Sequence, residues 1–274
     1  MIDLSEDECM DINAINVNIP DQYTPIVVLF GAPHMGKTMA LIRMIRWFES
    51  HGMTVKPELS FRPSYDEHYR RMCDSFNATV WRDTCPPCAG LMDFMLVKIL
   101  DRHGRSVCQL IDVPGEHFFG YSKCQLHIPA YMQHILNAPN RKVSFVFFCE
   151  KDWEETQQTR NAYVEAIRRM QFQMTPIGKR GKAVFLFSKV DRHYQYYDKY
   201  GSPVFKHFFR SIYNQYPGIF DNYTNHGIKK LLFGSYACKA LCFSAGVFTR
   251  REDGSIAWTQ GNDLYCEQFW KAIK

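Results

Sequence analysis

Short runs of consecutive hydrophobic residues recur along this chain, and most of them are too short to be helices. A short apolar run bounded by glycine, proline or charged residues is typical of a strand that is buried on both faces. By this criterion we expect strands at 26–30, 91–100, 107–111, 143–148, 183–187 and 239–243. Elsewhere, apolar residues recur at helical spacing. This spacing predicts helices at 38–48, 64–76, 152–172, 192–216 (interrupted near 201–203) and 263–274.

Predicted strands and helices alternate along most of the chain. This alternation indicates a three-layer α/β fold, with helices on both faces of a mainly parallel sheet. One strand should run antiparallel, because the charged, glycine-containing segment 101–105 joins two strands as a hairpin. Ligands of such sheets bind at the carboxyl ends of the strands, so we expect the functional residues there.

Charge is unevenly distributed over the 274 residues, whose formal net charge is +5. Residues 1–22 hold six acidic residues and no lysine or arginine. This acidic leader is either a solvated tail or a segment that lies on the protein's own basic surface. Residues 23–274 are expected to form a single domain with insertions near 49–80 and 195–238. Their basic residues are scattered, so no nucleic-acid partner is expected.

The first residues lack the pattern of a signal peptide, and no apolar run reaches the roughly 18–20 residues that span a bilayer. We therefore expect no membrane span, a cytoplasmic location and reduced thiols. Cys85 and Cys88 form an isolated C-x-x-C. Cys238 and Cys242 could complete a metal site with them, and two ordinary loop thiols are the simpler interpretation.

A phosphate-binding loop is the strongest motif in the chain. The pattern G-x-x-x-x-G-K-[ST] is matched by Gly31-Ala32-Pro33-His34-Met35-Gly36-Lys37-Thr38. It follows a buried strand and precedes an amphipathic helix, as this motif requires. Its backbone amides would surround phosphates, Lys37 would reach the β- and γ-phosphates, and Thr38 would offer its hydroxyl to Mg²⁺.

Two weaker motifs follow at the ends of later strands. Asp112-Val113-Pro114-Gly115 is a D-x-x-G sequence, in which the acid can hold Mg²⁺ and the glycine amide can meet a γ-phosphate. Farther on, Ser188-Lys189-Val190-Asp191 places a carboxylate that can accept two hydrogen bonds from guanine, which adenine cannot supply. Backbone amides of Ser244 and Ala245 could donate to the guanine carbonyl.

In this order, these pieces resemble the Ras-like branch of the P-loop GTPases, in the translation-factor-related class, over roughly residues 24–274. The chain is also somewhat similar to the bacterial double-GTPase and gliding-type groups. The resemblance implies a central six-stranded sheet that binds GTP or GDP with Mg²⁺ along one edge. It also implies a threonine that ligates Mg²⁺ ahead of the second strand, for which Thr84 is the first choice and Thr79 the second.

The chain departs from the family pattern at two positions of the site. Ser188 replaces the usual asparagine or threonine, which would weaken the preference for guanine. Glu116 stands where many members place the glutamine that orients water, and its charge would repel the γ-phosphate. His117 is a neighbouring alternative. We expect slow or partner-dependent hydrolysis.

The function expected from these motifs is a GTP-hydrolysing molecular switch that acts with a protein effector or regulator. In it, Lys37, Glu116 and Thr84 would serve catalysis, and Thr38, Asp112 and Thr84 would hold the metal. Two alternatives stay open: an ATP-dependent P-loop enzyme such as a small-molecule kinase, and a nucleotide-binding scaffold that does not hydrolyse. The sequence leaves the oligomeric state undetermined.

Overall fold

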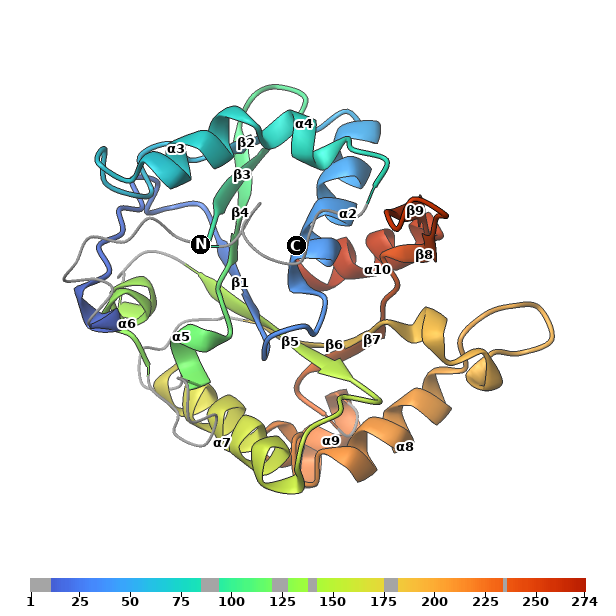
Figure 1. Ribbon diagram of the computed structural model, residues 1–274. Helices are drawn as coiled ribbons and strands as arrows, with labels where there is room; N and C mark the ends of the chain where they lie inside the picture. Colours follow the sequence, from blue (N-terminus) through green and yellow to red (C-terminus); the bar gives the residue numbers. More distant parts are fainter. Residues whose placement is uncertain (1–10, 85–93, 120–127, 138–141, 175–181, 234–235) are drawn as a thin grey trace.

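A mixed seven-stranded sheet organises the molecule, with strand order β2-β3-β4-β1-β5-β6-β7 (Figure 1). The computed structural model describes residues 11–84, 94–119, 128–137, 142–174, 182–233 and 236–274. In the sheet order, neighbouring strands pair in parallel from β4 through β1, β5 and β6 to β7. Strand β3 is antiparallel to both β2 and β4. The predicted α/β class and the hairpin around 101–105 are therefore confirmed.

Every strand except β3 runs in the same direction, so the carboxyl ends of these strands lie along one edge of the sheet. The strands are β1 (Ile26–Phe30), β2 (Thr54–Pro57), β3 (Leu96–Leu100), β4 (Ser106–Asp112), β5 (Val143–Glu150), β6 (Ala183–Ser188) and β7 (Lys239–Cys242). Every residue of β1 and β5 is buried, as a strand covered on both faces requires.

Helices cover both faces of this sheet. Figure 1 shows α2 and α10 together on one face, with α7, α8 and α9 across the sheet on the other. The helices are α2 (Lys37–Ser50), α3 (Glu67–Asp74), α4 (Phe76–Val80), α5 (Glu116–Phe119), α6 (Ala130–Asn137), α7 (Gln157–Met174), α8 (Phe205–Gln215), α9 (Gly227–Phe233) and α10 (Asp263–Ile273). Within the described ranges, no helix is both long and apolar enough to cross a membrane.

Two parts of the sheet architecture differ from the expectation. The sheet has seven strands instead of six, because β2 adds an edge strand inside the region taken as an insertion. A separate hairpin, β8 (Gly246–Arg250) and β9 (Ile256–Gln260), follows what was expected to be the last strand. Helix α7 also begins five residues later than the predicted start at 152.

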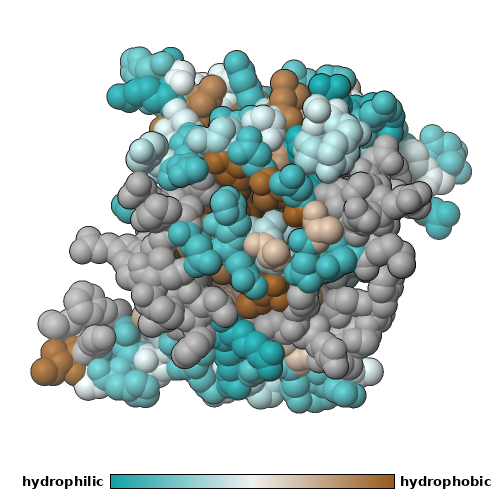
Figure 2. All heavy atoms as spheres, turned by 90° about the vertical axis from the view of Figure 1, so that its left-hand side faces the viewer, coloured by the Kyte–Doolittle hydropathy of each residue, from teal (hydrophilic) through white to brown (hydrophobic). Residues whose placement is uncertain are grey.

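The described half of the acidic leader packs against the body of the molecule. Ile15 and Ile19 are 4% and 3% exposed. The guanidinium of Arg62 donates to the carbonyl of Asn16, and the Asn18 amide donates to the carbonyl of Phe61. Residues 15–19 are therefore anchored to the rest of the molecule. Figure 2 looks onto the left-hand side of Figure 1, where α6 lies, and shows hydrophobic residues near the middle of a mostly hydrophilic described surface.

Candidate nucleotide-binding site

The phosphate loop has the geometry that its sequence predicts. It leaves the buried end of β1, turns through His34 and Gly36 with φ of 66° and 87°, and enters α2 at Lys37. These positive φ values lie in the left-handed region, which glycine adopts without strain. The loop therefore directs its last residues into the first turn of a 14-residue helix, whose amino end attracts anions.

Lys37 is buried within this loop. Its ammonium group donates to the carbonyl oxygens of Gly31 at 2.9 Å and Ala32 at 3.1 Å. The residue is 8% exposed, so its charge is held inside the loop by backbone dipoles. A phosphate that enters the loop could replace the two carbonyl oxygens as acceptor for the ammonium group, and its full negative charge would make these hydrogen bonds stronger.

Thr38 and Asp112 meet across the sheet edge although they are 74 residues apart in the sequence. The hydroxyl of Thr38, in the first turn of α2, donates to the carboxylate of Asp112 at 2.8 Å. Asp112 ends β4, which lies beside β1, and it is 2% exposed. A hydroxyl and a carboxylate at one point form the hard-oxygen donor set that Mg²⁺ prefers. The two predicted metal ligands are thus brought together.

The D-x-x-G turn lies directly against the phosphate loop. A Cβ atom at Gly115 would come within 2.7 Å of the Gly31 carbonyl oxygen and of the backbone nitrogen and Cδ of Pro33. Glycine is therefore required at this position by the close approach of two backbones. Glu116 begins α5, but its side chain lies outside the part that the structure describes.

His117, the alternative to Glu116, is buried in an aromatic environment. Its Nδ1 lies 2.9 Å from the hydroxyl of Tyr131, and the Phe94 ring packs edge-on at 5.1 Å. Burial, with a smaller contribution from the nearby charge of Arg62, lowers the pKa of His117 to about 4. The imidazole is consequently neutral at physiological pH and is bound to Tyr131.

This environment predicts a pH dependence of stability. Since the pKa of an unfolded histidine is about 6.5, the unfolded chain binds the additional proton between about pH 6.5 and 4. The free energy of unfolding should therefore have its full value above about pH 6.5. It should decrease as the pH falls below about 6.5, by about 3 kcal/mol in total near pH 4. Urea titrations at several pH values would measure this.

His117→Gln should flatten the dependence of the unfolding free energy on pH. His103→Gln, in the exposed β3–β4 turn, should leave this dependence unchanged. An unaltered slope in His117→Gln would contradict the assignment.

The residues predicted to select the base also converge. Lys189 follows β6 with a φ of 55°, and Asp191 lies in the next turn. The hydroxyl of Ser244, which follows β7, donates to Asp191 Oδ1 at 2.6 Å. The motif after β6 and the loop after β7 therefore form one polar surface, on which Ala245 is the next residue.

Ser188 makes none of the contacts that a longer amide side chain could make. Its hydroxyl is buried and has no hydrogen-bond partner among the described residues. A short side chain here cannot bridge to the phosphate loop, which agrees with the effect expected from the sequence departure.

Thr84 occupies a different environment from the metal pair. It forms an isolated antiparallel bridge with Ala257 of β9, and the Trp258 amide donates to the carbonyl of the preceding residue, Asp83. No hydrogen bond joins Thr84 to Thr38 or Asp112 in the described structure. Its proposed role in metal binding remains a prediction. Thr79, the second choice, is buried in α4.

Two arginines of α2 connect the site to the β8–β9 hairpin. Arg46 donates to the carbonyls of Val80 and Arg82 and lies 4.2 Å from the centre of the Trp258 ring. Arg43 is fully buried, donates to the Gly261 carbonyl at 2.9 Å and pairs with Asp263.

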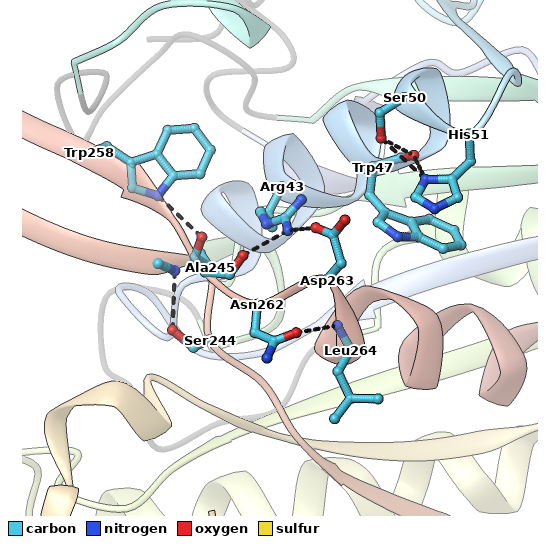
Figure 3. A network of polar contacts seen from close by, with 12 residues as sticks. Arg43, Trp47, Ser50, His51, Ser244, Ala245, Trp258, Asn262, Asp263 and Leu264 are labelled. Atoms are coloured by element: carbon cyan, nitrogen blue, oxygen red, sulfur yellow. Dashed lines mark hydrogen bonds and ion pairs between the residues drawn. The ribbon is translucent and has the colours of Figure 1, made fainter. Parts of the chain in front are cut away.

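The hairpin in turn holds the loop after β7. The Trp258 indole donates to the Ala245 carbonyl, and the Gly246 amide donates to the Ser244 hydroxyl (Figure 3). The loop after β7, the hairpin and α2 therefore form one connected polar network. No sequence motif indicated this hairpin, although the turn Asp253-Gly254 is a signal that could have predicted it.

The predicted thiol site is partly outside the described residues, because Cys85 and Cys88 fall there. Cys238 and Cys242 are free. In the described ranges, no three His, Cys, Asp or Glu side chains gather as a metal site would require.

No known protein family matches this chain by sequence, and no curated protein does. Its topology is distantly similar to solved GTP-binding proteins. One is nucleolar GTP-binding protein 1 from Plasmodium falciparum, 14% identical over 84% of this chain and 80% of that chain, with a TM-score of 0.36.

Two further similarities are of the same kind. The signal recognition particle receptor SRb-GTP/SRX complex from Chaetomium thermophilum is 13% identical over 84% of this chain and 93% of that chain, with a TM-score of 0.39. An apo GTPase from Pyrococcus abyssi is 14% identical over 90% of this chain and 95% of that chain, with a TM-score of 0.37. At these values the similarities are distant ones of fold, and no statement about the site rests on them.

Proposed function

We propose that this protein binds GTP together with Mg²⁺ and acts as a slow, partner-dependent GTPase switch. The observation that carries the proposal is the contact of Thr38 with Asp112 at 2.8 Å, at the amino end of the helix that follows the phosphate loop. Two hard-oxygen ligands beside an anion-binding loop fit a metal–phosphate complex better than they fit a structural hydrogen bond alone.

Each residue of the site has a definite role in this proposal. The loop amides and Lys37 would bind the β- and γ-phosphates, and Thr38 and Asp112 would hold the metal. Bound Mg²⁺ would offset negative charge on the phosphates. Gly115, already against the loop, would place its amide near the γ-phosphate. Water attack on that phosphate would release phosphate and leave GDP.

Guanine recognition is proposed for Asp191. Its Oδ1 accepts a hydrogen bond from Ser244, which restrains the carboxylate. The lone pairs of the carboxylate can accept from the guanine N1–H and 2-amino groups. The unpartnered Ser188 hydroxyl and the buried, neutral His117 support a weak base preference and slow hydrolysis.

The test is nucleotide selection by the purified protein and its Asp191→Asn variant. We expect a fluorescent GDP to bind the wild type and to be displaced more readily by GTP than by ATP. Asp191→Asn should lose about a hundredfold in guanine affinity, because two charge-assisted hydrogen bonds are lost, and should gain affinity for xanthine nucleotides. Asp253→Asn, at the exposed tip of the β8–β9 hairpin, is the matched control and should bind as the wild type does.

Other outcomes would favour the alternatives. Preferential binding of ATP would indicate a P-loop kinase or related enzyme. Tight GTP binding without phosphate release, with or without candidate partner proteins, would indicate a binding scaffold. Fast hydrolysis by the isolated protein would contradict the slow switch.

A further inference from the structure

Glu150 is a buried carboxylate at the proposed nucleotide site that no sequence motif assigns. It is the last residue of β5 and stands in register with Ser188, directly before Lys189. The residue is 5% exposed, and its backbone carbonyl accepts from the buried Tyr216 hydroxyl at 2.8 Å. The backbone position of Glu150 is therefore fixed beside the base-selecting motif.

Two cations, one in that motif and one directly after it, converge on the Glu150 carboxylate. The ammonium group of Lys189 donates to Oε2 at 2.6 Å, and the guanidinium of Arg192 lies 3.4 Å from Oε1. A buried carboxylate of this kind needs positive partners. Lys189 is the principal one, because its side chain is 23% exposed, whereas that of Arg192 is 64% exposed.

This ion pair determines where the Lys189 side chain lies. A Cβ atom placed at Gly36 would be 3.7 Å from Cε and 4.0 Å from Cγ of Lys189. The aliphatic part of the side chain thus extends beside the phosphate loop, with its ammonium end held by Glu150. In this position its methylene groups present an apolar surface between the phosphate loop and Asp191, where a purine ring can stack.

We infer that Glu150 is a positioning residue for nucleobase recognition, which holds Lys189 extended as the surface on which the purine of a nucleotide packs. This rests on the proposed function. It predicts that Glu150 affects the affinity for ligands that carry a base. It should not affect the affinity for a phosphate chain alone, because Lys37 and the loop amides would make the phosphate contacts.

The experiment compares two ligands on the full chain. Fluorescent GDP reports binding with the base, and inorganic tripolyphosphate, as its competitor, reports binding without the base. Glu150→Gln should lower the GDP affinity about tenfold, because Lys189 is no longer held in place before the base binds, and leave the tripolyphosphate affinity unchanged. Lys189→Met keeps an aliphatic side chain but removes the ammonium group, so it should give the same loss. The double variant should lose no more than either single variant.

Glu165→Gln is the matched control, because Glu165 forms an exposed ion pair with Arg169 on α7. Circular dichroism establishes that the variants are folded, and Lys189→Met provides the test if Glu150→Gln is not. Equal loss of GDP and tripolyphosphate affinity would assign Glu150 a merely structural role and overturn the inference. An unchanged GDP affinity in both variants would overturn it as well. If fluorescent GDP does not bind the wild type, the proposed function itself fails and takes this inference with it.

Discussion

Replacing Lys37 by alanine is expected to lower the affinity for GTP and GDP by at least about a hundredfold. The ammonium group is buried, already bound to the Gly31 and Ala32 carbonyls, and placed to exchange those partners for phosphate oxygens. Charge-assisted hydrogen bonds from a buried ammonium group to phosphate account for a loss of this size. Equilibrium titration with fluorescent GDP measures it.

Lys206→Ala is the control for Lys37→Ala, since Lys206 lies on the exposed face of α8 and should not affect binding. The melting temperature of Lys37→Ala should stay close to that of the wild type. Unchanged nucleotide affinity in a folded Lys37→Ala protein would contradict the assignment of the loop.

Replacing Gly115 by alanine is expected to destabilise the protein by about 2–3 kcal/mol and to weaken nucleotide binding. The added methyl group would lie 2.7 Å from the Gly31 carbonyl oxygen and from two atoms of Pro33. Because these neighbours belong largely to backbone, the phosphate loop itself must shift, and overpacking of this kind typically costs that much. Urea unfolding and fluorescent GDP binding measure the two effects.

Gly52→Ala provides the comparison for the Gly115 variant. Gly52 has a φ of 75° and nothing within 4 Å of its missing Cβ atom. Its substitution should cost about 1 kcal/mol for the left-handed conformation alone and leave nucleotide affinity unchanged. If both variants bind nucleotide as the wild type does, the contact between the D-x-x-G turn and the phosphate loop has no role in binding.

Local sequence was sufficient for the central elements. The continuous apolar runs of β1, β5 and β6 predict buried strands because both faces of these strands are covered. Gly36, Lys37 and Thr38 predict the strand–loop–helix geometry because backbone conformation and motif spacing are local properties. The contact of Thr38 with Asp112 then follows from the pairing of β1 with β4.

Other features depend on contacts that no local pattern encodes. The strand β2 has four residues and a single buried position, Val55, so it is too short to produce a recognisable alternation. Most residues of β8 are exposed, which removes the hydrophobic signal. Glu150 belongs to no motif, and its importance arises from the distant Lys189. The position of Thr84 depends on Ala257, which is far along the chain.

The link between Arg43 and the last helix has a consequence for the order in which the chain can fold. Arg43 is buried, and the partners of its guanidinium, Gly261 and Asp263, come 218 and 220 residues later. During synthesis, the guanidinium on the phosphate-loop helix has neither partner until the final segment has left the ribosome. Contacts of such long sequence separation close late and slow folding. Completion of the proposed nucleotide site is therefore coupled to completion of the polypeptide, and we expect that a nascent chain that ends before α10 does not retain nucleotide.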